Sequence, residues 1–212
     1  MSKTHEFIAV LALSLIGLVG CDYEPRAAWD ANPPPVAEMK KAVRDLWVGH
    51  IFWIRHVVSN SAANNQEKRD SVEKEVWENA KQIASTITPF YGEAVSQEFL
   101  NLLNINYGAI KAYSEATVTR DKRRQHAALA RLGSNADDIA DFLSHLNPYL
   151  QKDIIRGLIE AHSAHHILQI NQYKEKEYAP PMANWPMMRQ HVYLIADTLT
   201  AAVVKQFPSE FP

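Results

Sequence analysis

Apolar residues recur at helical spacing along almost the whole chain beyond residue 36. The alternation of apolar and polar residues that would indicate strands is absent. Clusters of proline, glycine and asparagine separate the periodic segments. The pattern therefore predicts an all-α bundle of about six helices. We expect them over residues 37–59, 67–88, 93–117, 121–145, 151–175 and 186–206.

The chain also matches itself at an interval of about 56 residues, and self-similarity at a fixed interval is typical of a repeated unit. In the first helix of each pair, the interval relates His50 to Asn106 and Asn106 to His162. In the second helices it relates Asn79 to Asn135 and Asn135 to His191. One interval that holds across both helices predicts a helical hairpin present three times. The pattern fits both a closed bundle and an open stack of hairpins.

Each predicted helix places one polar side chain inside its apolar stripe. Burying an amide or an imidazole without a partner costs roughly 1–3 kcal/mol, so these groups should pair with one another, with water or with a ligand. The favoured interpretation is a polar layer that is structural or lines a ligand site, in which hydrogen bonds fix helix register, and a transition-metal site is the sharper alternative. The six residues are His50, Asn79, Asn106, Asn135, His162 and His191.

Histidines from different helices could instead converge on a transition metal. His50, His162 and His191 would be the ligands of Zn²⁺ or copper, with His166 one turn after His162 on the same face. The chain has no HExxH motif, and its acidic residues lie mostly off the apolar stripes. Because no pair of inward carboxylates can be nominated for acid–base chemistry, an enzyme is less expected than a binding protein.

The first 20 residues have the order of a secretory signal, with an apolar run over residues 7–19 that is shorter than the roughly 20 residues a membrane span needs. Its end, Leu18-Val19-Gly20-Cys21, resembles the lipobox of bacterial prolipoproteins. That resemblance implies cleavage before Cys21 and a diacylglycerol thioether with palmitate-type chains on its sulfur. It also implies that Asp22 favours the periplasmic face of the inner membrane, with the outer membrane as the other location.

The predicted organisation is thus a signal peptide at residues 1–20, a lipidated, proline-rich tether at 21–35 and a helical domain at 36–212. Cys21 is the only cysteine and has no partner for an intramolecular disulfide. With 22 basic and 24 acidic residues, the formal charge of −2 gives no electrostatic case for nucleic acid. We expect an envelope lipoprotein that binds a protein partner or a small ligand without catalysis, and metal binding is the alternative.

Three further segments resemble an uncharacterised bacterial family of helical proteins with an LWxxHxxW-R opening. They are LWVGHIFWIR at residues 46–55, NADDIA at 135–140 with the Asn147-Pro148 step, and QFP at 206–208. The similarity covers most of residues 43–208. It implies the helical fold and the position of the polar layer, and brings no established activity. That family carries histidine at the position of Asn106, which weakens a fully histidine-based site in this chain.

Overall fold

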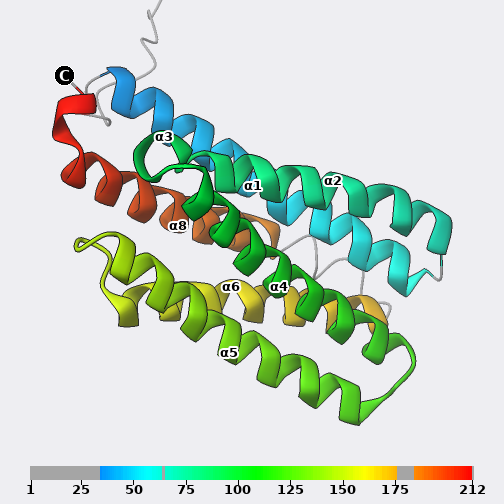
Figure 1. Ribbon diagram of the computed structural model, residues 1–212. Coiled ribbons are helices and arrows are strands. Elements are labelled where there is room, and N and C mark those ends of the chain that lie inside the picture. Colours follow the sequence, from blue (N-terminus) through cyan, green and yellow to red (C-terminus); the bar gives the residue numbers. More distant parts are fainter. Residues whose placement is uncertain (1–33, 64, 176–183, 212) are drawn as a thin grey trace, which may run out of the picture. The chain divides into compact units, whose positions relative to one another are not determined.

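The computed structural model describes residues 34–63, 65–175 and 184–211. The predicted signal peptide, Cys21 and most of the predicted tether lie outside the described residues. Within these residues the fold is helical and contains no strand, which confirms the all-α prediction (Figure 1). The elements are α1 (Pro34–Ala62), α2 (Gln66–Ser85), α3 (Thr88–Tyr91), α4 (Glu93–Val118), α5 (Lys122–Leu146), α6 (Lys152–Lys174), α8 (Trp185–Gln206) and the 3₁₀ turn η2 (Pro208–Glu210).

The six long helices begin and end within a few residues of the predicted bounds, and local chemistry explains several ends. The side chain of Asn65 caps α2 by accepting from the Lys68 amide at 3.2 Å, and Asp121 caps α5 in the same way. The first helix begins at Pro34, earlier than predicted, and proline is compatible with the first turn of a helix. The short α3 and η2 were not predicted.

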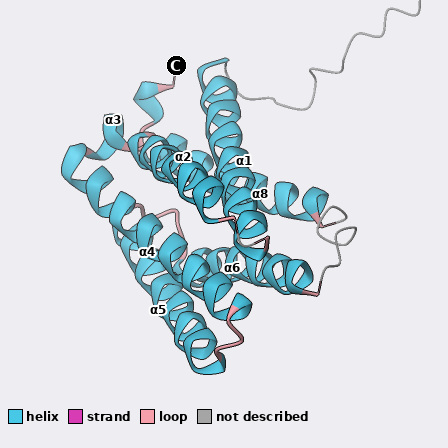
Figure 2. Cartoon of the chain, turned by 90° about the vertical axis from the view of Figure 1, so that its right-hand side faces the viewer, coloured by secondary structure: helices cyan, strands magenta, loops and turns pink. Residues whose placement is uncertain are grey.

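The helices close into a bundle rather than an open stack. The parallel helices α1, α4 and α6 contact one another and form its centre (Figures 1 and 2). Around them, α2 packs on α1 and α4, while α5 packs on α4 and α6. The last helix α8 returns to α1 and contacts α6 less closely. A bidentate ion pair between Arg44 and Asp197, with N–O distances of 2.7 and 2.6 Å, joins α1 to α8.

The core consists of two apolar clusters. The first contains Trp47, Leu103 and Ile159, and the second contains Ile54 and Ile110. Along α4 and α6, the polar residue of the predicted layer falls between the residues of the first cluster and those of the second, and on α1 His50 lies within one turn of both clusters. The fold therefore places a polar layer between two apolar halves of one core. Among the described residues, no helix has both the length and the apolar character needed to cross a membrane.

Candidate functional site: a buried polar layer

Three residues of the layer bond to the backbone of a neighbouring helix, and we call them the register residues: Asn79, Asn135 and His191. The Nδ2 of Asn79 donates to the Leu46 carbonyl at 3.0 Å, and the Nδ2 of Asn135 donates to the Leu102 carbonyl at 3.1 Å.

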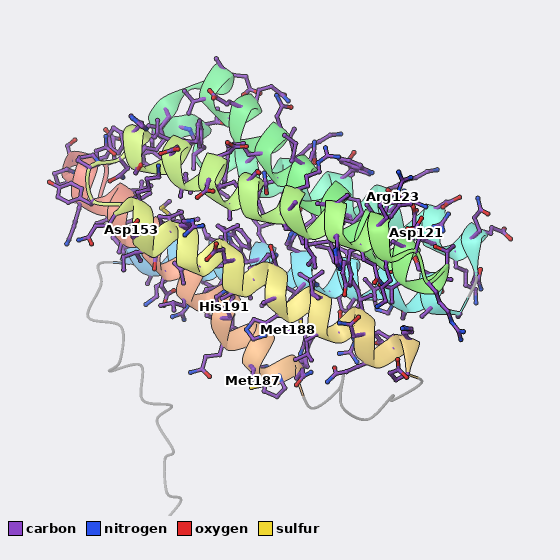
Figure 3. The ribbon with its side chains drawn as sticks, turned by 90° about the horizontal axis from the view of Figure 1, so that it is seen from below. Asp121, Arg123, Asp153, Met187, Met188 and His191 are labelled. Carbon is purple, nitrogen blue, oxygen red and sulfur yellow. The ribbon has the colours of Figure 1, made fainter. Side chains whose placement is uncertain are left out.

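The third register residue makes the corresponding bond from α8. The Nε2 of His191 donates to the Leu158 carbonyl at 2.9 Å. Figure 3 labels His191 on α8, beside α6. In all three cases donor and acceptor are 33 residues apart in the chain. Each bond therefore fixes the longitudinal position of one outer helix against one central helix.

The other three residues of the layer lie on α1, α4 and α6, and we call them the central residues: His50, Asn106 and His162. Each is at most 4% exposed. The Nδ2 of Asn106 donates to the side-chain oxygen of Asn135 at 2.9 Å and lies 3.5 Å from the hydroxyl of Ser163. Asn106 thus links α4 to α5 and α6, whereas the two central histidines make different contacts.

The imidazoles form a row that runs from α1 through α6 to α8. The rings of His50 and His162 are stacked with centroids 5.5 Å apart, and those of His162 and His191 are 6.4 Å apart at 20°. His166 lies edge-on to His162 at 4.8 Å. The Trp47 ring meets both His50 and His162 edge-on. The row therefore extends from the centre of the core to the half-buried His191.

Several polar atoms in this row have no hydrogen-bond partner within the described part of the chain. They are Nδ1 of His50, Nε2 of His162, both ring nitrogens of His166, Nε1 of Trp47 and Oε1 of Gln169. His166 and Gln169 are completely buried. An unsatisfied buried polar group costs roughly 1–3 kcal/mol, so the layer carries an energetic cost that a bound molecule with matching groups would relieve.

Burial also keeps these histidines neutral. It lowers the pKa of His50 to about 4, an effect that the neighbouring Asn79 partly opposes, and lowers the pKa of His166 to about 3. The pKa of His162 falls well below its usual value, through burial first and the surrounding imidazoles second. At neutral pH each ring therefore offers one nitrogen lone pair and one N–H.

The structure brings the four histidines proposed as metal ligands into one cluster. Stacked rings, such as those of His50 and His162, hold their nitrogen lone pairs in nearly parallel planes instead of aiming them at a point between the rings. In the described residues, no group of three or more His, Cys, Asp or Glu side chains is arranged so that it could hold a metal ion. Metal binding by this cluster stays a prediction.

Five of the six predicted layer residues are buried and His191 is half-buried. Three neighbours were not assigned to the layer from the sequence: Trp47, Ser163 and Gln169. The Nε2 of Gln169 contacts the Met188 sulfur at 3.7 Å, which joins α6 to α8. Gln169 lies one turn beyond His166 on the same face of α6, so helical periodicity was the available signal. That signal was weak because the equivalent positions of the first two predicted hairpins carry Val57 and Tyr113, which are not amides.

Comparison with known proteins finds no matching family model, no matching curated protein and no matching solved structure. The resemblance to the uncharacterised helical family therefore stays a prediction.

Proposed function

We propose that this protein is a bacterial envelope lipoprotein whose helical domain binds a protein partner or a small ligand without catalysing a reaction. The order of residues 1–21 supports the location: a short apolar segment ends in the lipobox-like Leu18-Val19-Gly20-Cys21. In this proposal residues 1–20 are removed, Cys21 carries the lipid, and Asp22 favours the periplasmic face of the inner membrane.

One observation carries the binding function: among the described residues the fully buried imidazole of His166 has no partner for either nitrogen, and it adjoins the Nε2 of His162, which has none there either. A ligand with both donor and acceptor groups would satisfy these atoms. The buried polar side chains of the described core are His, Asn, Gln, Ser and Thr, without an acidic residue among them. This composition supports recognition more than acid–base catalysis.

The location is tested by replacing Cys21 with serine in cells. We expect wild-type protein to incorporate labelled fatty acid and sediment with membranes, and Cys21→Ser to lose the label and retain its signal. Asp22→Ser should move the protein toward the outer membrane where the sorting rule of enteric bacteria applies. Full labelling of Cys21→Ser, or unlabelled wild type, would contradict the anchor.

The ligand is tested on the mature protein purified in detergent, by mass spectrometry of small molecules released on denaturation. We expect a molecule that co-purifies with wild type and is lost from His162→Leu. The matched control is His126→Leu, which removes an exposed histidine from α5. A folded His162→Leu variant that releases the same molecule in the same amount would reject the polar layer as its site.

A soft metal ion is the second candidate, favoured by the open nitrogens of His50, His162 and His166. Cu(I) accepts two or three soft or imidazole ligands, so fewer side chains must point at one position than for tetrahedral zinc. Titration of the mature protein with Cu(I) and with Zn²⁺ separates this candidate from an organic ligand. Binding equal to that of His162→Leu, for both ions, would exclude it.

We also propose that the bundle consists of three copies of one helical hairpin of about 56 residues. The three register bonds support this organisation, because each joins the same two positions of the unit. The surroundings of the central helices support it as well, since α2, α5 and α8 each adjoin two of them.

A further inference from the structure

A groove of about 450 Å³ lies beside α1, on residues that the polar layer does not use. Four of its residues follow one face of α1 at helical spacing, and the remaining two come from the end of α6 and the start of α8. We call it the aromatic groove. Its lining among the described residues is Phe52, Arg55, His56, Ser59, Tyr173 and Trp185, a set with three aromatic rings besides the imidazole and without an acidic side chain.

Arg55 is the charged group of this groove and is held at two points. Its Nε donates to the hydroxyl of Tyr173 at 3.3 Å, and its guanidinium carbon lies 5.5 Å from the ring centroid of Trp185. In the described part of the chain, no carboxylate forms an ion pair with Arg55, and its two terminal nitrogens make no hydrogen bond. By contrast, the guanidinium of Arg156 on the surface of α6 binds Asp137 and Glu160.

A half-buried guanidinium that has no acidic partner within the described residues can bind an anion. Its planar fork matches the two oxygens of a carboxylate in a bidentate pair, which is shorter and stronger than a neutral hydrogen bond. Contacts to Tyr173 and Trp185 already restrict the side chain, so less conformational entropy is lost when an anion binds.

Aromatic side chains supply the rest of the recognition surface. Phe52 exposes 41% of its surface, which is high for a phenylalanine, and its ring lies 4.4 Å from the ring of His56. The indole of Trp185 lies against the guanidinium of Arg55. Such rings attract another flat ring through offset or edge contacts. The groove therefore combines one anion-binding fork with a surface for an aromatic group.

We infer that the aromatic groove binds a small organic anion in which a carboxylate is attached to a flat aromatic ring. The carboxylate pairs with the terminal nitrogens of Arg55, and the ring lies against Phe52 and Trp185. This site goes beyond the function proposed above and does not depend on it, because it shares no residue with the polar layer.

The probe is 2-naphthoate, titrated into the mature wild-type protein by calorimetry. We expect a dissociation constant below about 1 mM, which is typical of a small ligand with one strong polar anchor. The amide 2-naphthamide keeps the ring without the charge, and acetate keeps the charge without the ring. Both should bind at least about tenfold more weakly. Absence of naphthoate binding, or equal binding of the amide, would overturn the inference.

Arg55→Met tests the assigned residue and should weaken naphthoate binding by about tenfold or more, since it removes the charged donor. The matched control is Arg123→Met on α5, which removes an equal charge from an exposed residue near the start of that helix (Figure 3). It should leave the affinity unchanged. Equal loss in both variants would indicate a general charge effect and reject the site.

If Arg55→Met does not fold, wild-type protein decides the question by nuclear magnetic resonance. Addition of naphthoate should shift the indole N–H of Trp185 and the Nε–H of Arg55, and leave the Trp47 indole unmoved. Shifts confined to other residues would reject the groove. His166→Leu should retain full naphthoate binding, so failure of this inference is distinguishable from failure of the polar-layer proposal.

Discussion

At position 191 a histidine makes the bond that asparagine makes at positions 79 and 135. The reason lies in reach: imidazole Nε2 is farther from Cβ than the amide nitrogen of asparagine. The helices α6 and α8 pair less closely than α1 with α2 or α4 with α5. A longer side chain is therefore needed to reach the Leu158 carbonyl from α8.

This explanation predicts opposite results for two amides at position 191. His191→Gln should keep the bond to Leu158, because glutamine extends one methylene beyond asparagine, and its melting temperature should stay close to wild type. His191→Asn should lose the bond and about 1 kcal/mol of unfolding free energy. Thermal and urea unfolding of both variants provides the measurement. If asparagine proves as stable as glutamine, reach does not explain the histidine.

The sequence predicts that the three register residues face the core. It does not predict which groups accept their hydrogen bonds. Periodicity places Asn79, Asn135 and His191 on inward faces, because a face depends only on spacing along one helix. The acceptor of each is a backbone carbonyl on another helix. Every residue has a carbonyl, so no pattern of side chains identifies the one that accepts. The stacking of His50 on His162 depends in the same way on the angle and distance between helices.

Between elements, the close approach of α1 and α2 depends on a glycine. A Cβ added to Gly49 would lie 3.0 Å from Nδ2 of Asn79, which the Leu46 carbonyl holds in place. The equivalent positions of the other two proposed hairpins carry Ile105 and Ala161. Gly49 is therefore specific to the first helix pair, where it makes room for the amide of the facing helix.

A double-mutant cycle tests this contact. Alanine in place of glycine inside a helix gains about 1 kcal/mol of intrinsic propensity. Gly49→Ala alone should show little of that gain, because the new methyl displaces Asn79 and weakens its bond. In the Asn79→Ala background the same substitution should stabilise the protein by about 1 kcal/mol. Additive unfolding free energies across the cycle would show that the two residues do not interact.

The sequence predicts the helix boundaries well, but it does not predict how the bundle closes. Caps such as Asn65 and Asp121 are local, so the starts of α2 and α5 were predictable to about one residue. The return of α8 to α1 is a contact between the two ends of the domain. It depends on the packing of all the helices between them, and the ion pair of Arg44 with Asp197 that joins them has no sequence signature.

For the molecule as a whole, the buried histidines couple folding to pH. In the unfolded chain they titrate near 6.5, whereas folding lowers the pKa of His50 to about 4 and that of His166 to about 3. Below pH 6.5 the unfolded state binds more protons than the folded state, so acid favours unfolding. The stability from these groups is complete above their unfolded pKa and is lost progressively toward the folded values.

Urea unfolding between about pH 7 and pH 5 should therefore show a free energy that falls with acidity, by up to about 1.4 kcal/mol per pH unit for each buried histidine. His166→Ile is the control, because Ile54 and Ile110 occupy the equivalent positions of the first two proposed hairpins. It should remove one such contribution and flatten the profile. An unchanged profile in this variant would show that folding does not lower the pKa of His166.

The isolation of the His166 ring also has a consequence for its tautomer. The Leu158 carbonyl selects the Nε2–H form of His191, because a carbonyl oxygen can only accept. Neither nitrogen of His166 has a partner among the described residues, so no neighbour makes that choice for it. A ring in this condition can exchange tautomers without losing a hydrogen bond. The molecule that enters the layer, and not the fold, would then decide which nitrogen carries the hydrogen.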